Sequence, residues 1–103
     1  MAVNNKSELF SALKAHRARL KHLGVKRCGV FGSFARGMQS EQSDVDILVE
    51  FEPGKKSFDN FMGLAFFLED TIGRRVELVT PESLSPYIGP HILREVEYAS
   101  TGE

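Results

Sequence analysis

Residues 25–51 read VKRCGVFGSFARGMQSEQSDVDILVEF, two short apolar runs separated by a glycine-containing turn and a polar loop. The first run, residues 25–31, is too short for a convincing helix and leads into Gly32 and Ser33, which predicts a strand that ends in a tight turn. The second run, residues 43–51, alternates apolar side chains with mostly polar ones, the pattern of a strand with one buried face. Two strands close together in the chain are therefore expected here.

Helical periodicity flanks these strands. Apolar residues recur on one helical face over residues 6–23, which follow the capping residue Asn5 and end at Gly24. The same spacing over residues 58–72 predicts a second helix. A last helix is expected from Pro90, with an apolar set of Ile92, Leu93, Val96 and Ala99.

A third strand is expected over residues 75–80, RVELVT, which Pro81 stops. Residues 82–90 hold two prolines and a glycine and are expected to form a loop, either without regular structure or with one helical turn. The order helix, strand, strand, helix, strand, helix predicts an α/β (α+β) fold, a small mixed β-sheet flanked by helices. A length of 103 residues suits a single domain over residues 1–103.

The composition excludes several classes of protein. With 42% hydrophobic and 26% charged residues, the chain has the composition of a globular protein rather than a disordered one. Its longest apolar stretch, residues 64–68, is far shorter than the roughly 20 residues that span a bilayer, so no membrane insertion is expected. A lone cysteine, Cys28, and the lack of a signal-peptide pattern at the start favour the cytoplasm.

The net charge of −1 conceals a basic first segment, because residues 1–27 hold seven Lys or Arg against one acidic residue. Such a segment could attract RNA or an acidic partner, or it could be a solvated helix face. The pI near 6.3 argues against a dedicated nucleic-acid binder, so no direct nucleic-acid binding is expected.

Two acidic residues, Asp44 and Asp46, share one face of the strand expected over residues 43–51. Residues at i and i+2 of a strand are about 6.5 to 7 Å apart and point the same way, so their carboxylates can converge on shared cations. Oxygen ligands favour Mg²⁺ or Mn²⁺ over zinc. The alternative is that this Asp-x-Asp pattern is only the polar side of a half-exposed strand.

Glu77 interrupts the apolar strand VELV, residues 76–79. An ionised carboxylate costs several kcal/mol to bury unless it is paired or bound to a metal, so a partner is expected. If the third strand lies beside the second, Glu77 could be a third metal ligand or the base that accepts a proton from an attacking hydroxyl. It could instead pair with Arg74 or Arg75.

The turn after the first strand carries groups that suit a triphosphate. Glycine at position 32 lets backbone N–H groups approach phosphate oxygens, Ser33 offers a hydroxyl, and Arg36 offers a charged fork. Neither a Walker loop nor a Rossmann glycine pattern occurs in the sequence. The alternative is that the turn merely connects two strands.

Three motifs follow one another along the chain: GSFARG at residues 32–37, SDVDILV at 43–49 and VELV at 76–79. Together they resemble the minimal nucleotidyltransferase branch of the DNA polymerase beta superfamily, over roughly residues 25 to 98. The resemblance implies a palm-like mixed sheet flanked by helices. It also implies transfer of a nucleoside monophosphate from a nucleoside triphosphate to a hydroxyl, with release of pyrophosphate.

The resemblance also assigns the site. Gly32, Ser33 and Arg36 would hold the phosphates of ATP, Asp44 and Asp46 would bind two Mg²⁺ ions, or Mn²⁺ in their place, and Glu77 would complete the catalytic set. The family more often has aspartate where this chain has Glu77. One more methylene moves a carboxylate by more than about 1 Å, and catalytic geometry tolerates little such displacement.

Minimal nucleotidyltransferases of this size resemble the antitoxins of prokaryotic toxin–antitoxin pairs whose toxin is a HEPN ribonuclease. The resemblance therefore implies an adenylyltransferase that modifies a tyrosine of its toxin. The alternative, which the departure at Glu77 keeps open, is a nucleotide-binding module that neutralises its partner by complex formation alone. Surplus apolar residues on the helix expected over 58–72 suit either core packing or a surface for a partner or a second copy of the chain: Leu64, Phe66 and Phe67.

Overall fold

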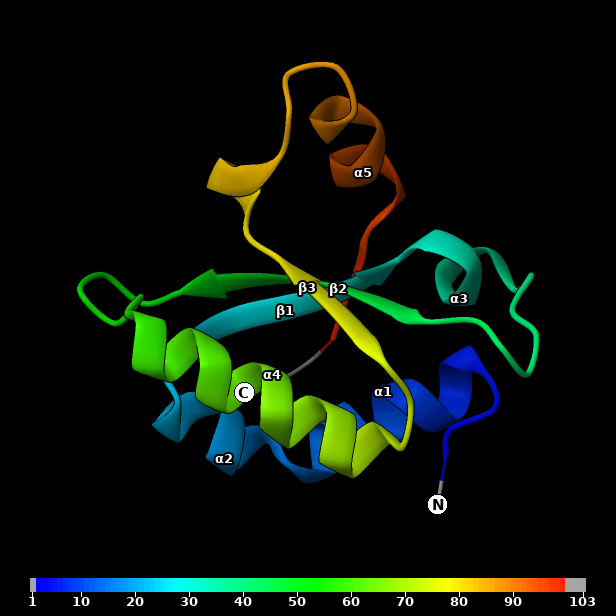
Figure 1. Cartoon of the computed structure of the whole chain (residues 1–103), viewed down its shortest axis with the longest axis horizontal. Coiled ribbons are helices and arrows are strands. Elements are labelled where there is room, and N and C mark those ends of the chain that lie inside the picture. Colours follow the sequence, from blue (N-terminus) through cyan, green and yellow to red (C-terminus); the bar gives the residue numbers. More distant parts are fainter. Residues whose placement is uncertain (1, 100–103) are drawn as a thin grey trace.

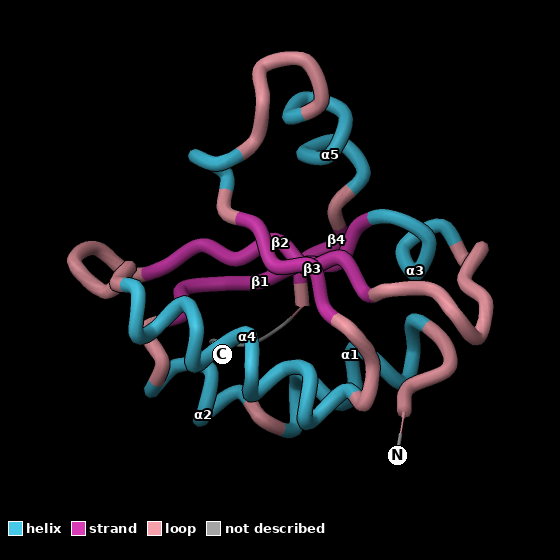
Figure 2. The backbone as a smooth tube through the Cα atoms, viewed as in Figure 1, coloured by secondary structure: helices cyan, strands magenta, loops and turns pink. Residues whose placement is uncertain are grey.

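Four strands form one mixed β-sheet in the computed structural model of the chain, which describes residues 2–99. The strands are β1 (Val25–Phe31), β2 (Val45–Phe51), β3 (Val76–Val79) and β4 (Glu97–Tyr98). Their order across the sheet is β3-β2-β1-β4, with β2 antiparallel to β1 and parallel to β3, and β4 antiparallel to β1. Figure 2 shows the strands crossing the middle of the molecule, between two sets of helices.

The helices lie on both faces of this sheet. Three of them, α1 (Lys6–Ala15), α2 (Arg17–His22) and α4 (Phe58–Ile72), lie below the sheet in Figure 1, and α5 (Gly89–Glu95) stands above it with the 3-10 turn η1 (Pro81–Ser83). A further short helix, α3 (Gly32–Arg36), follows β1 directly. The expected mixed sheet flanked by helices is confirmed. No helix within residues 2–99 has the length and apolar character needed to cross a membrane.

The alternation along β2 divides the core into two clusters. Val45, Ile47 and Val49 are fully buried against the face that α1, α2 and α4 cover. Leu48 points to the other face, where it forms a smaller cluster with Phe31 of β1 and Ile92 of α5. Because side chains alternate along a strand, Asp46 lies on the same face as Leu48, the face that carries α5.

Two elements near the N-terminus differ from the sequence-based expectation. The helix expected over residues 6–23 is interrupted at His16, whose backbone (φ −108°, ψ 22°) is not helical, so that α1 and α2 are separate. The tight turn expected at Gly32 and Ser33 is instead the helix α3, which ends at Gly37 in the left-handed conformation (φ 71°). This places Ser33 and Arg36 on a helix instead of a loop.

The last helix is shorter than expected. It ends at Glu95, because Val96 has an extended backbone (φ −64°, ψ 136°), and the expected apolar positions Val96 and Ala99 are therefore outside it. The chain after Val96 forms β4, which pairs with Gly29 and Val30 of β1. The free edge of β1 thus converts the end of a predicted helix into a strand.

Candidate functional site

The site is built around the junction of β1 and α3. Gly32 stands at this junction with φ +74°, a conformation that other residues rarely adopt. A Cβ atom at this position would collide with the carboxylate of Asp46 on the neighbouring strand. Glycine is therefore required here for two reasons, its backbone conformation and the space that a Cβ atom would need. Because glycine has no side chain, the backbone at the start of α3 can lie close to the Asp46 carboxylate.

Two of the three expected acidic residues are directly opposite each other in the sheet. Asp46 of β2 and Glu77 of β3 are register partners in the parallel pair, and Asp44 lies immediately before β2. Asp46 is half-buried, whereas Asp44 and Glu77 are exposed. The sheet thus brings Asp46 and Glu77 side by side, and Asp44 is near enough for its charge to act on Asp46.

The charges of these residues act on one another. Burial, followed by the negative charges of Glu77 and Asp44, raises the pKa of Asp46 from 3.8 to about 6, and the positive charge of Arg36 opposes this only in part. A raised pKa means that the ionised carboxylate is disfavoured where it stands. The cluster therefore carries electrostatic repulsion that a cation would relieve.

The structure corrects the reason for which Glu77 was singled out. Its side chain is exposed on the edge strand β3, so no buried charge requires a partner. The alternative that it pairs with Arg74 or Arg75 also fails, because none of the ion pairs within residues 2–99 includes Glu77. What makes Glu77 part of the site is its register with Asp46.

Arg74 has a different role, which the sequence did not reveal. Its guanidinium donates hydrogen bonds to the backbone oxygens of Ser43 (2.9 Å), Ser40 (3.0 Å) and Val3 (2.7 Å). The guanidinium also lies over the ring of Phe34 in α3, 5.0 Å from its centre. Arg74 thereby fixes the loop that leads into β2 and positions Asp44, the next residue after Ser43.

The expected phosphate-binding groups converge, but on a carboxylate of the chain itself. The backbone N–H of Gly32 donates to Oε2 of Glu95 (2.8 Å), and Nη1 of Arg36 donates to Oε1 of the same side chain (2.7 Å). The Gly32 hydrogen bond, with a further contribution from Arg36, lowers the pKa of Glu95. Sequence reasoning missed Glu95, since it lies 63 residues from Gly32 and belongs to none of the three motifs.

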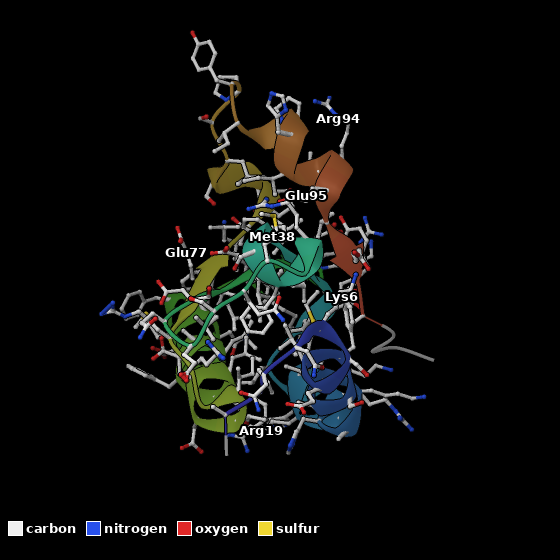
Figure 3. All side chains as sticks on the ribbon, turned by 90° about the vertical axis from the view of Figure 1, so that its right-hand side faces the viewer. Lys6, Arg19, Met38, Glu77, Arg94 and Glu95 are labelled. Carbon is white, nitrogen blue, oxygen red and sulfur yellow. The ribbon has the colours of Figure 1, made fainter. Side chains whose placement is uncertain are left out.

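A hollow of about 290 Å³ lies next to this contact. Its lining combines the junction of β1 and α3 with residues of α5 and the residue before it: Phe31, Gly32, Arg36, Ile88, His91, Ile92 and Glu95. Figure 3 shows Glu95 above α3 and Glu77 to the side of it, on β3. Ser33 is half-buried on α3, next to Gly32.

The donors of the acidic cluster are all carboxylate oxygens, the kind of ligand that Mg²⁺ prefers. Asp44, Asp46 and Glu77 do not yet form a closed ligand set, because within residues 2–99 no three acidic, His or Cys side chains are arranged so that they could hold a metal ion. The two exposed members, Asp44 and Glu77, have the freedom to turn toward a shared cation. The chemistry and charge of the cluster fit a hard divalent ion.

Known proteins share this sequence and this fold. Residues 13–99 match the nucleotidyltransferase domain family. The chain is 46% identical over 99 residues to the protein adenylyltransferase MntA of Thermococcus cleftensis, covering 95% of this chain and 99% of that protein. A solved structure described as a minimal nucleotidyltransferase superposes with a TM-score of 0.81 at 33% identity, over 94% of this chain and 98% of the other.

A more distant likeness extends to the fold alone. One chain in a crystal structure of a toxin–antitoxin with AMP-PNP superposes with a TM-score of 0.62 at 22% identity, over 80% of this chain and 70% of that chain. The mixed sheet, the glycine junction against Asp46 and the match over residues 13–99 agree with one another. On these grounds the chain belongs to the nucleotidyltransferase domain family, and it is a nucleotidyltransferase.

Proposed function

We propose that this nucleotidyltransferase is a Mg²⁺-dependent adenylyltransferase that moves AMP from ATP to a protein hydroxyl, and that the acceptor is a tyrosine of a HEPN-class toxin. The observation that carries the proposal is the contact between the Gly32 backbone and the Asp46 carboxylate. This contact lies between the residues that would bind phosphate and the carboxylates that would bind a metal. The relative named as a protein adenylyltransferase supports a protein acceptor, since it matches this chain over nearly the full length of both.

Asp44, Asp46 and Glu77 would hold the metal. A divalent cation, once bound, stabilises the negative charge that develops on the phosphoryl oxygens and on the leaving pyrophosphate. The repulsion that raises the pKa of Asp46 would be replaced by attraction to the ion. Glu77, exposed at the sheet edge beside Asp46, would serve either as the third metal ligand or as the base that accepts the proton of the incoming hydroxyl.

Gly32, Ser33 and Arg36 would bind the triphosphate. A backbone N–H, a hydroxyl and a guanidinium from five consecutive positions of one short helix can contact successive phosphate oxygens. These groups orient the phosphate chain against the carboxylate cluster. Such positioning contributes several kcal/mol to a group transfer.

The acceptor is proposed to come from a partner protein. Solved structures that share this fold include a complex described as the toxin–antitoxin MntA–HpeT, which is a precedent for a toxin partner. The proposed nucleotide site is on the α5 face of the sheet, where Asp46 is half-buried and its register partner Glu77 is exposed. A hydroxyl carried by another protein, or by a second copy of the chain, could approach from this side.

A second candidate is a nucleotide-binding antitoxin that inhibits its toxin by complex formation alone. The open arrangement of Asp44, Asp46 and Glu77 favours it, because the described residues do not present a closed metal site. The side chain of Glu77 is one methylene longer than that of the aspartate more common in the family, which is a second reason to consider this candidate. The two candidates differ in whether the toxin is modified.

Mass spectrometry separates these candidates. The chain is incubated with ATP, Mg²⁺ and a candidate HEPN-class protein, and the intact mass of that protein is measured. Addition of one AMP, on tyrosine by peptide mapping, supports the enzymatic function, whereas free tyrosine should remain unmodified. Asp46→Asn should abolish the addition, while Asp70→Asn, an exposed control on α4, should not. An unmodified toxin that is inhibited in a stable complex would favour the second candidate.

A further inference from the structure

Glu95 accepts hydrogen bonds from two donors that the proposed function assigns to phosphate, the backbone N–H of Gly32 and the guanidinium of Arg36. Each of its two carboxylate oxygens takes one donor, the Gly32 N–H at 2.8 Å and Arg36 Nη1 at 2.7 Å. These distances are those of short, charge-assisted hydrogen bonds. Among the ion pairs within residues 2–99, the Arg36–Glu95 pair is the shortest.

A carboxylate and a phosphate compete for such donors, because both are anions whose oxygens accept hydrogen bonds. The carboxylate is planar and the phosphate is tetrahedral, but the two groups are similar in size. The Gly32 N–H can be directed at one acceptor only. A triphosphate that binds Gly32 and Arg36 must therefore remove Glu95 from them. If Glu95 stayed, its negative charge would lie next to the phosphate and repel it.

We propose that Glu95 is an internal latch, which closes the phosphate-binding site in the free protein and is displaced when the triphosphate binds. This inference rests on the proposed function, since it takes Gly32 and Arg36 as phosphate ligands. The inference goes beyond the proposed function in two ways. It gives a role to Glu95, which lies outside the three sequence motifs, and it makes the chain compete with its own substrate for the same donors. Glu95 thereby sets the affinity for nucleotide rather than the chemistry of transfer.

The surroundings of Glu95 allow this displacement. Glu95 is the last residue of α5, and the extended backbone begins at the next residue, Val96. The side chain of Glu95 is 27% exposed and that of Arg36 is 52% exposed, so neither is locked by packing on all sides. The hollow of about 290 Å³ next to the contact gives space for the displaced carboxylate beside Ile88 and His91.

The latch has a measurable thermodynamic consequence. The apparent dissociation constant equals the intrinsic one divided by the fraction of molecules in the open state. A latch that is closed in about nine molecules of ten therefore weakens nucleotide binding about tenfold. Removing the charge of Glu95 should recover this factor.

The competing explanation is purely structural. In that case Glu95 would only tie α5 to α3, and its replacement would loosen the site and weaken nucleotide binding. The latch predicts the opposite change in affinity. Tighter nucleotide binding after replacement of Glu95 therefore supports the latch, and weaker binding supports a purely structural role.

Isothermal titration of the full chain with ATP and Mg²⁺ provides the test. Glu95→Gln should bind ATP about tenfold more tightly than the wild type. Glu97→Gln is the matched control, because Glu97 is also paired to a cation, Lys6, at 2.9 Å, and lies two residues further along. This control should bind ATP as the wild type does, which separates the latch from a general loss of negative charge.

Arg36 gives an independent check, because it takes part in both the latch and the ligand site. In the wild type, Arg36→Ala removes a phosphate ligand and also weakens the latch, so the two effects partly cancel. In the Glu95→Gln background only the loss of the ligand remains. Arg36→Ala should therefore weaken ATP binding by a larger factor in the Glu95→Gln background than in the wild type.

The outcomes separate failure of the latch from failure of the proposed function. Equal or weaker ATP binding by Glu95→Gln, alongside measurable binding by the wild type, would overturn the latch. Absence of ATP binding in the wild type, in Glu95→Gln and in Glu97→Gln would overturn the proposed function itself. If Glu95→Gln proves unfolded by circular dichroism, Glu95→Asp replaces it, since the shorter side chain cannot reach both donors. It should then bind ATP more tightly than the wild type, and a failure to do so would overturn the latch.

Discussion

Asp46 and Glu77 are opposite each other in the parallel pairing of β2 with β3, and both lie on the face of the sheet that carries α5. Burial of Asp46, followed by the negative charges of Glu77 and Asp44, raises its pKa to about 6. The structure without a cation is therefore held under electrostatic repulsion at neutral pH. This relationship leads to two predictions about stability and metal binding.

The first prediction concerns pH. Since the folded chain binds a proton at Asp46 more readily than the unfolded chain does, the free energy of unfolding should decrease as pH rises from about 4 to about 6. Because Asp46 is only half-buried, the expected change is about 1 kcal/mol. Urea denaturation at several pH values without metal measures it, and Asp46→Asn should lack this component. If the free energy of unfolding depends on pH in the same way for the wild type and for Asp46→Asn, the raised pKa does not belong to Asp46.

The second prediction concerns the acidic pair. The double variant Asp44→Asn with Asp46→Asn should lose Mg²⁺-dependent ATP binding in isothermal titration, because it retains neither of the two carboxylates at the start of β2 and just before it. Without metal it should be no less stable than the wild type, since the substitution removes repulsion. A large drop in its thermal midpoint would show that the pair is structural, and unchanged ATP binding would remove both residues from the site.

The third prediction concerns the phosphate ligands on α3. In the Glu95→Gln background, where only the loss of a ligand counts, Arg36→Ala should weaken ATP binding about tenfold and Ser33→Ala about threefold, because a charge-assisted contact contributes roughly twice as much as a neutral one. Titration calorimetry with both variants gives the order. Arg94→Ala on α5 is a control, since its guanidinium lies in hydrogen-bond distance of His91 in the same helix. If neither substitution changes the affinity for ATP, α3 only connects β1 to the following loop and does not bind phosphate.

The fourth prediction isolates the contact between Gly32 and Asp46. Gly32→Ala should lower the free energy of unfolding by more than the 1 to 2 kcal/mol or so that a left-handed backbone costs an L-residue, because the added Cβ also collides with the carboxylate. Gly54→Ala is the matched control, with a similar φ of +77° and no atom within 4 Å of the added Cβ. Equal destabilisation of the two variants, measured by urea denaturation, would mean that Asp46 moves aside freely.

The strands that carry the site were predictable because their patterns are local. The alternation over residues 43–51 placed Asp46 on the face opposite Val45 and Ile47, and the structure confirms this from Val45 onward. The order of helices and strands was likewise enough to predict a mixed sheet. Local periodicity and turn residues determine such elements before any tertiary contact is known.

The parts that were missed depend on distant contacts. Glu95 meets Gly32 across 63 residues, and the guanidinium of Arg74 meets the Ser43 backbone across 31. The strand β4 forms because β1 offers a free edge, which no pattern within residues 90–99 indicates. Glu77 was singled out for burial that it does not have, because a strand at the sheet edge and one in its centre can share the same apolar sequence.

The position of Arg74 has a consequence for the order in which the molecule folds. Its guanidinium joins the N-terminal segment at Val3 to the loop at Ser40 and Ser43, so three distant parts of the chain meet at one side chain. Contacts between residues far apart in sequence form slowly, because the intervening chain must first lose its freedom. We therefore expect Asp44 to reach its final place only after α4 and β3 have docked, which makes maturation of the site one of the last events on the folding pathway.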